Sequence, residues 1–488
     1  MANDSNRFQA IISHCKEYGF IFPSSEIYDG LQAVYDYGQM GSELKKNIRD
    51  HWWKSMTQMQ DNIVGIDAAI FMHPTTWKAS GHVDNFNDPM IDNKDSKKRY
   101  RVDHLIEGHA EQMEKDNRKD EAKGLLDEMD QLLAKDDFAG LKKLIVDRNI
   151  KCAVSGTSNW TDVRQFNLMF ATEFGAVSEE EGADNKVYLR PETAQGIFVN
   201  FLNVQKSGRM KIPFGIAQTG KAFRNEIVAR QFIFRMREFE QMEMQFFVRP
   251  GTHQQWYEHW KKERLNWHLE LCISPAKLRY HDHLKLAHYA DAACDIEFEF
   301  PIGFKEVEGI HSRTDFDLKQ HQEFSRKKIQ YFDNDIDPAT NKPFGNYIPY
   351  VIETSIGLDR MFLLVMSEAY EEQDLGTPEK PDSRVVLRFN PKLAPIKLAV
   401  LPLTKKDGLP EIANDIMKNC RSSFRCFYEE KDSIGKRYRR MDALGTPFCV
   451  TVDHQSKEDQ TVTIRYRDSM EQERVPISSI KEKILSSL

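Results

Sequence analysis

The segment from Phe232 to Arg249 constrains the fold most strongly, because its polar and apolar side chains alternate over a length typical of a long strand. The odd-numbered positions are Arg235, Arg237, Phe239, Gln241, Glu243 and Gln245, and Phe234, Met236, Met242, Met244 and Phe246 alternate with them. Successive strand side chains point to opposite faces, so we expect one largely polar face and one core face. A solvated outer face of an antiparallel sheet would give the same pattern. Two arginines, a ring and a carboxylate together favour a nucleotide site instead, because guanidinium groups bind phosphate oxygens and a carboxylate accepts from an amine.

Other patterns place this strand in a sheet flanked by helices. Residues Val187 to Phe247 are strand-rich, a second strand block covers Ile296 to Phe304, and Ile63 to Met72 forms a short apolar strand. Gln254 to Leu271 and Gly357 to Ala369 have helical spacing. The expected fold class is therefore α+β, with long antiparallel strands covered by helices.

Two further segments indicate more than one domain. Residues 105 to 150 are highly charged, and their apolar side chains recur at helical spacing, which predicts a helical insertion. Prolines and charges cluster from 378 to 395 before a new α/β pattern begins, so we divide the chain into domains 1–390 and 391–488. In the second domain we expect strand Ile396 to Pro402, helix Pro410 to Cys420, strand Phe424 to Tyr428, a basic loop Gly435 to Arg440 and strand Phe448 to Val452.

Composition excludes a strongly basic protein. The 488 residues carry a formal charge of -7, so a site for a polyanion has to be a local patch. The seven cysteines are scattered and form no Cys-x-x-Cys pair, which favours a reducing, cytoplasmic location. We find no signal peptide and no apolar run long enough to span a bilayer, so we expect no membrane partner.

The segment Gly215 to Lys221 has the glycines and the lysine of a phosphate-binding P-loop. The next residue is Ala222, where a P-loop needs a Ser or Thr hydroxyl for magnesium. The sequence that follows is typical of a strand and not of a helix N-terminus, so the match is interpreted as accidental.

Three short segments resemble the signature motifs of class II aminoacyl-tRNA synthetases. They are a helical stretch from Glu43 to Trp53 leading to Pro89, the sequence FRNE at 223–226, and GLDR at 357–360. Longer strings resemble the glycyl enzymes of that class: SGHVDNF at 80–86, LRPETAQG at 189–196, RMREFEQME at 235–243 and SIGKRYRR at 433–440. The resemblance implies a class II catalytic domain with a C-terminal anticodon-binding domain. The implied activity is ATP-dependent formation of glycyl-adenylate, followed by transfer of glycine to the 3′ end of tRNA(Gly).

The chain departs from the family pattern at two places. Residues 37–41 read YGQMG where relatives have Gly-Pro-Leu-Gly, which we expect to affect a turn only. Some relatives have paired cysteines that suggest a zinc site, whereas residues 93–98 contain none here and Cys152 stands alone. A structural zinc needs about four ligands, so none is expected.

The resemblance assigns roles to the ATP site. Arg224 and Arg360 are implied as catalytic residues, with Arg224 on the α-phosphate and the glycine carboxylate and Arg360 at the far end of the triphosphate. Glu226 would accept from the adenine amino group, Phe239 would stack on the ring, and Glu306 would bind Mg²⁺. The implied ATP-binding set is Arg224, Asn225, Glu226, Phe234, Arg235, Met236, Arg237, Glu238, Phe239, Glu306, Val307, Gly357, Leu358, Asp359 and Arg360.

Glycine offers no side chain, so its site has to bind the ammonium and exclude a methyl group. Glu192, Glu243 and Glu353 are the candidates for the ammonium. Because a pocket gains only about 1–3 kcal/mol from one methylene, crowding has to contribute. The implied glycine-binding set is Arg101, Glu192, Phe239, Glu240, Gln241, Met242, Glu243, Glu353, Thr354, Ser355, Ile356 and Gly357.

The resemblance also implies a homodimer and contact with tRNA(Gly), for which Lys436, Arg437, Arg439 and Arg440 offer local positive charge. Two alternatives remain open at this point. One is an accessory protein with a synthetase fold and no catalysis, and the other is an enzyme that makes adenylates or dinucleoside polyphosphates without charging tRNA. The presence of Arg224, Glu226 and Arg360 disfavours the first, and the C-terminal domain disfavours the second as a main role.

Overall fold

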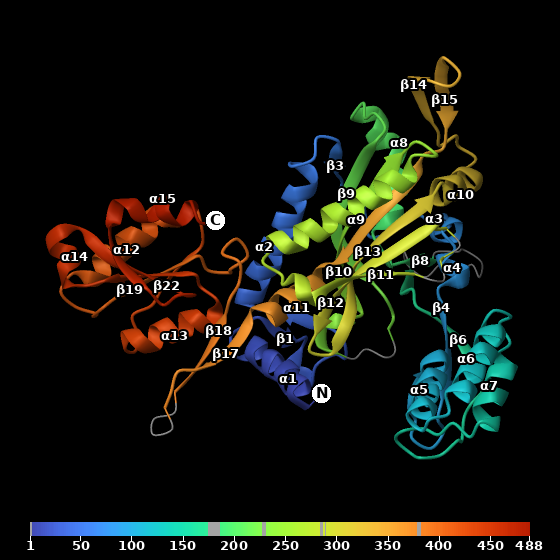
Figure 1. Cartoon of the computed structure of the whole chain (residues 1–488), viewed down its shortest axis with the longest axis horizontal. Helices are drawn as coiled ribbons and strands as arrows, with labels where there is room; N and C mark the ends of the chain where they lie inside the picture. The colour runs from blue at the N-terminus through green and yellow to red at the C-terminus, as the bar shows by residue number, and fades with distance from the viewer. Residues whose placement is uncertain (1, 174–185, 227–230, 284–285, 288, 378–381) are drawn as a thin grey trace.

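A computed structural model describes residues 2–173, 186–226, 231–283, 286–287, 289–377 and 382–488. Its centre is a seven-stranded sheet in the order β11-β12-β13-β16-β10-β9-β3 (Figure 1). Adjacent strands are antiparallel except β3, which runs parallel to β9 at one edge. The strands are β3 (Ile63–Gly65), β9 (Phe214–Phe223), β10 (Glu238–Val248), β11 (Leu278–Asp282), β12 (Ala292–Phe300), β13 (Gly303–Thr314) and β16 (Tyr350–Gly357). The expected antiparallel sheet is confirmed.

One face of this sheet is covered by α2 (Gln39–Thr57), α9 (His253–Glu270) and α11 (Leu358–Ala369), with α1 (Ala2–Glu17) beside them. Their apolar side chains form the largest core of the described residues, which includes Trp52, Phe246 and Phe362. The N-terminal turn of α2 contacts the preceding chain closely. A Cβ on Gly41 would lie 1.8 Å from the carbonyl oxygen of Phe20, so only glycine fits there.

The opposite face is covered at one end by α8 (Ala194–Ser207). Phe198 and Phe201, three residues apart on α8, pack against Phe214 and Phe247 of the sheet. Within 187–247, the segment expected to be strand-rich, residues 194–207 form this helix instead, because their apolar side chains recur at helical spacing. The candidate site lies further along this face.

The boundaries of three expected strands also differ. The strand block predicted from Ile296 to Phe304 is interrupted, because β12 ends at Phe300 and β13 begins at Gly303. The strand predicted from Phe232 begins only at Glu238, because Gln231 and Phe232 have positive φ angles and 232–234 form a 3₁₀ turn. The strand predicted from Ile63 ends at Gly65. The carbonyl of Ala68 beyond it accepts a bond from the side chain of Arg190, and no sheet ladder continues there.

The charged segment forms three helices, α5 (Val102–Lys115), α6 (Lys119–Leu133) and α7 (Phe138–Asp147), as expected. They pack with β4 (Asn87–Asp92), β5 (Arg99–Arg101) and β6 (Arg164–Asn167) around a separate small core that includes Leu125 and Trp160. Figure 1 shows this unit extending away from the central sheet.

The C-terminal part has its own five-stranded sheet, ordered β20-β19-β21-β22-β23, and its own core. Its elements are β19 (Leu398–Pro402), α12 (Leu409–Cys420), β20 (Cys426–Tyr428), α13 (Ile434–Leu444), β21 (Phe448–Val452), α14 (His454–Asp459), β22 (Thr461–Tyr466), β23 (Gln472–Pro476) and α15 (Ile480–Leu485). The basic loop expected at 435–440 is wrong, because these residues belong to helix α13. Its Arg437 is buried and donates to the carbonyls of Pro402 and Glu429. Met441, four positions along the helix, packs in the largest core described above.

Shorter elements connect these parts. They are β1 (Ile21–Pro23), β2 (Tyr35–Tyr37), α3 (Pro74–Ala79), α4 (His82–Asn85), β7 (Ala171–Glu173), β8 (Lys186–Tyr188), α10 (Phe316–Ser325), β14 (Tyr331–Asp337), β15 (Lys342–Tyr347), β17 (Tyr370–Asp374) and β18 (Ser383–Leu387). Across the described ranges, no helix has the length and apolarity that crossing a membrane requires.

Candidate active site

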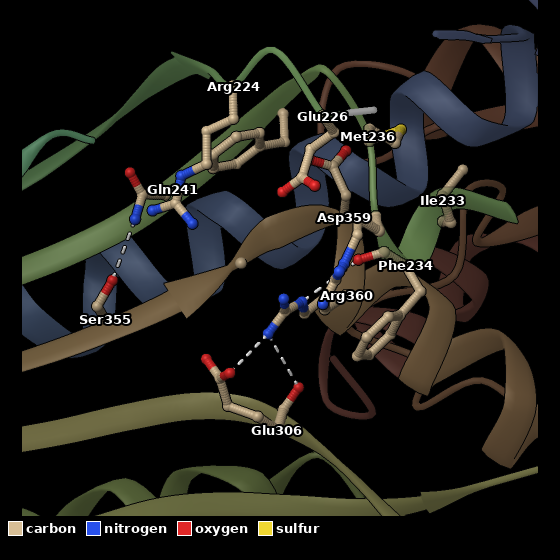
Figure 2. Close-up of a pocket in the computed structure, with 13 residues that line it drawn as sticks. Arg224, Glu226, Ile233, Phe234, Met236, Gln241, Glu306, Ser355, Asp359 and Arg360 are labelled. Atoms are coloured by element: carbon tan, nitrogen blue, oxygen red, sulfur yellow. Dashed lines mark hydrogen bonds and ion pairs between the residues drawn. The ribbon is translucent and has the colours of Figure 1, made fainter. Parts of the chain in front are cut away.

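A pocket opens where β10, β16 and β13 meet the first turn of α11 (Figure 2). Phe239 and Gln241, two odd-numbered residues of β10, line it, as the alternation predicts. It is lined by Arg224, Glu226, Ile233, Phe234, Arg235, Met236, Phe239, Gln241, Glu306, Ser355, Gly357, Asp359 and Arg360. Most of the predicted ATP-binding residues are therefore brought together by the fold.

Arg224 follows the last residue of β9 and enters the pocket between two rings. Its guanidinium carbon lies 5.5 Å from the ring centre of Phe86 and 5.3 Å from that of Phe239, distances typical of cation–π contact. Its Nε donates to the carbonyl of Pro191 at 3.1 Å, which leaves the two terminal nitrogens to face the pocket. The side chain is thus held in one place before any anion binds.

Arg360 enters from the first turn of α11 on the other side of the pocket (Figure 2). Its guanidinium lies 4.5 Å from the ring centre of Phe234, its Nε donates to the Phe234 carbonyl at 3.3 Å, and its Nη1 forms an ion pair with Glu306 at 3.0 Å. The neighbouring charge of Arg360 lowers the pKa of Glu306, so this carboxylate is ionised. Two fixed cations therefore face one pocket.

Two buried carboxylates, Glu243 and Glu353, and the partly exposed Glu192 lie further along the same face. Glu243 of β10 and Glu353 of β16 are both bonded to the side-chain amide of Gln245, at 2.9 and 2.7 Å. Glu192, just before α8, lies 3.3 Å from the ring nitrogen of His82. Gln241 lies between this group and the cations, where it accepts from the Thr193 amide and donates to Ser355.

The three carboxylates differ in charge. Burial raises the pKa of Glu192, but His82 outweighs it and brings the pKa to about 2. Burial alone would raise the pKa of Glu353, but the neighbouring Arg313 and His311 have the larger effect, so the pKa of Glu353 is lowered. For Glu243, burial beside the other two carboxylates raises the pKa well above its ordinary value. These directions favour ionised Glu192 and Glu353 and the protonated form of Glu243.

Even-numbered residues of β10 face the other way. Glu238 forms an ion pair with Lys221, Glu240 bonds to Lys45 and Arg49 of α2, and Met242 is in the core. Thr354, Ile356, Val307 and Leu358 are likewise almost completely buried and do not line the pocket. These predicted residues are near the site in sequence, but the strand pleat, or for Leu358 the packed face of α11, directs their side chains away from it.

Arg101 and Arg237 lie at the margin. Arg101 forms ion pairs with Asp88 and Asp103 in the insertion, at 3.2 Å to Asp88, and does not reach the three carboxylates. Arg237 donates to the backbone carbonyls of Glu226 and Gln32, so its guanidinium holds chain segments together. Asn225, whose amide donates to Leu168, is also fixed by its backbone.

Four polar residues of the site had no role in the sequence-based prediction: His82, Thr193, His311 and Arg313. Thr193 donates to Glu243, His311 contacts Glu353 at 2.8 Å, and Arg313 donates to Glu353 at 3.0 Å. His82 and Thr193 lie inside the quoted strings 80–86 and 189–196, which was the available signal. His311 and Arg313 alternate along β13, a pattern that a strand-by-strand reading of polar positions would have found.

The chain is similar to known proteins over nearly its whole length. Three family models match: "tRNA synthetase class II core domain (G, H, P, S and T)" over 176–370, "Glycyl-tRNA synthetase insertion domain 1" over 88–124 and 116–168, and "Anticodon binding domain" over 397–487. The chain is 54% identical to a glycine--tRNA ligase of Chlorobaculum tepidum, over 98% of this chain and 99% of the relative. It is 50% identical to the same enzyme of Treponema denticola, over 98% and 97%, and 51% identical to that of Staphylococcus haemolyticus, over 97% of each.

Proposed function

The chain belongs to the glycine--tRNA ligase family of class II synthetases, and from that premise we propose that its pocket activates glycine with ATP. The observation that supports this assignment most directly is the order of charges along one sheet face. Two fixed guanidinium groups, of Arg224 and Arg360, lie at one end, and the buried carboxylates lie at the other. A triphosphate and an ammonium group, joined through a carboxylate between them, match this order.

Activation requires positioning more than proton transfer. An oxygen of the glycine carboxylate attacks the α-phosphorus of ATP, a new O–P bond forms, and the bond to pyrophosphate breaks. No protein base is needed, because the attacking carboxylate is already ionised. Arg224 would neutralise the α-phosphate and align the carboxylate, while Arg360 would hold the far end of the triphosphate. Phe239 would pack against the adenine and Glu226 would accept from its amino group.

The protonation of Glu243 fits binding of an ammonium. When glycine brings its positive charge between Glu192, Glu243 and Glu353, the cation stabilises the ionised form of Glu243 and the proton is released. Two partners are already fixed, because Gln245 and Thr193 hold the Glu243 oxygens. The close spacing of these groups also leaves little room for the methyl group of alanine.

Magnesium would accompany ATP. Glu306 is an ionised, half-exposed carboxylate in the pocket, and Mg²⁺ characteristically uses one or two carboxylates together with phosphate oxygens. No cluster of three or more metal-binding side chains occurs among the residues that the structure describes, which is compatible with an ion that arrives with the nucleotide. Bound Mg²⁺ would neutralise charge that develops on the phosphates.

Transfer of glycine to the 3′ end of tRNA(Gly) would follow at the same pocket. We propose that residues 1–390 form the catalytic domain with its insertion at about 105–150, and that residues 391–488 bind the anticodon region. Of the four cations suggested for tRNA, Arg437 is buried, Arg439 pairs with Asp382, and Arg440 pairs with Glu429 and Asp432. Lys436 is the remaining candidate for contact with phosphate. We also propose that the protein forms a homodimer and is located in the cytoplasm.

The test is exchange of pyrophosphate into ATP with glycine, alanine or serine, followed by charging of a tRNA(Gly) transcript. Exchange with glycine alone, together with charging, supports the proposal. The Arg224→Ala variant should lose exchange, while Arg209→Ala, a surface change in the same core domain, should retain it. Folded protein that exchanges with no amino acid would contradict the assignment and favour a non-catalytic accessory protein.

A further inference from the structure

A buried cluster of charges lies directly behind the pocket, on the face of the sheet that α2 covers. It joins Lys45 of α2, Tyr37 at the end of β2, Asp359 of α11 and Glu240 of β10. All but Tyr37 are under a tenth exposed. The cluster connects four elements: β2 and α2, which are consecutive in the chain, and β10 and α11, which are distant from them in sequence.

Asp359 is the hub. Its Oδ1 accepts from Tyr37 and from Lys45, the latter at 2.7 Å, and its Oδ2 accepts from the backbone amide of Glu240 at 2.7 Å. The carboxylate therefore ties the first turn of α11 to β10. Lys45 also lies 3.4 Å from a carboxylate oxygen of Glu240 and 4.2 Å from the ring centre of Tyr37.

The next residue after Asp359 is Arg360, whose side chain leaves the same helical turn and enters the pocket. Its guanidinium is held by the ring and the carbonyl of Phe234, at 4.5 and 3.3 Å, and by an ion pair with Glu306, whose side chain is 48% exposed. These contacts hold the end of the side chain, whereas the buried bonds of Asp359 hold the helical turn from which it starts. A shift of this turn would move the guanidinium relative to a bound triphosphate.

We infer that Lys45 and Tyr37 are positioning residues for Arg360, acting through Asp359 on the placement of ATP. Both are outside the pocket and touch no substrate. The inference rests on the proposed activation of glycine by ATP, and it adds two residues to the part of the chain that determines the geometry of that step. It also makes α2 a support of the catalytic pocket in addition to a packing helix.

Charge makes Lys45 hard to replace. Asp359 and Glu240 are two buried carboxylates, and Arg49, whose side chain is 37% exposed, reaches only Glu240, at 3.0 Å. Without Lys45, Asp359 keeps only uncharged partners, the Tyr37 hydroxyl and the Glu240 amide. A buried carboxylate without a cation is strongly unfavourable, so α11 and β10 should separate locally to let water in.

The test compares Lys45→Met and Tyr37→Phe with Lys46→Met, a matched control because Lys46 is the next residue of α2 and makes only an exposed pair with Asp50. Pyrophosphate exchange is measured while ATP and glycine are varied separately. We expect Lys45→Met to raise the KM for ATP about tenfold, and Tyr37→Phe about threefold, because a displaced Arg360 holds the bound triphosphate less tightly. The KM for glycine should stay within about twofold, since the carboxylates that bind it lie elsewhere. A purely structural role would instead lower active protein and leave both KM values unchanged.

The outcomes distinguish failure of the proposed function from failure of the role inferred for Lys45 and Tyr37. If the unmodified protein does not exchange with glycine, the proposed function fails. If it does, and both variants have the ATP KM of Lys46→Met, the inference is overturned. Equal changes in the KM for ATP and for glycine would overturn it as well. Should Lys45→Met not fold, as judged by circular dichroism, the result for Tyr37→Phe decides, because that change removes only one hydroxyl and keeps the ring packed on Phe362.

Discussion

Replacing Arg313 by methionine should show how strongly the carboxylate group depends on one buried cation. Arg313 donates to Asp317 at 2.8 and 3.0 Å and to Glu353 at 3.0 Å, and its guanidinium stacks 4.1 Å from the ring centre of Tyr289. Methionine fills most of the same volume but leaves the buried Asp317 without its cation and Glu353 with His311 as its charged neighbour. Breaking a buried pair in this way costs about 3–5 kcal/mol, so Arg313→Met should be destabilised by that amount.

Urea unfolding followed by tryptophan fluorescence measures this effect, because all seven tryptophans lie between residues 52 and 267, in the part of the chain that contains the sheet. The matched variant is Arg313→Met with Asp317→Asn, in which the amide oxygen can still accept from Gln195. Removing the Asp317 charge, which has lost its cation in the single variant, should recover about half of the loss, roughly 2 kcal/mol. A loss below about 1 kcal/mol in the single variant, or no recovery in the double variant, would refute the reasoning.

Three further predictions concern stability. The pKa of Glu192 is about 2 in the folded protein and near 4.5 in the unfolded chain, so its ionised form should stabilise the fold above pH 4.5 and lose this effect as pH falls toward 2. Glu192→Gln should therefore flatten the fall in urea midpoint between pH 5 and 3. Burial lowers the pKa of Lys397 to about 7. Between pH 7 and 10 the unfolded chain therefore holds one proton more than the folded protein, and the free energy of unfolding should rise with pH over this range. Circular dichroism should show no such rise for Lys397→Met relative to wild type. Gly41→Ala should cost more than about 3 kcal/mol through its contact with Phe20, whereas Gly108→Ala in α5, with nothing within 4 Å, should stabilise by up to about 1 kcal/mol; equal thermal midpoints would contradict this.

Local patterns were sufficient for much of the fold and for the main pocket. The alternation along β10 correctly places Phe239, Gln241 and Glu243 on one face, because the pleat repeats every two residues wherever the strand lies. The helices α9, α11 and α12 were expected within two residues of their bounds from apolar spacing. The sequence strings also identified the family, which the whole-length similarity confirms.

Where local pattern failed, a contact with a distant part of the chain decided the conformation. Residues 435–440 look like an exposed basic loop, yet they form α13 because Arg437 and Met441 are buried by strands and connections of the C-terminal sheet. Residues 232–237 continue the alternation of β10, but a turn with positive φ angles interrupts it beside α11, where Arg360 bonds to Phe234. The strands that bury Arg437 and the Arg360 side chain that bonds to Phe234 are distant in the sequence, so the local pattern does not show them.

The sequence alone determined which side chains are available for the chemistry and on which face of a strand each one lies. It could not determine their charge or their partners. Glu192, Glu243 and Glu353 are the same residue type, but His82 lies beside the first, Arg313 beside the third, and burial keeps a proton on the second. These neighbours are separated by 40 or more residues in the chain or come from different strands. Only the packed structure brings them within hydrogen-bonding distance in a medium where water no longer screens their charges.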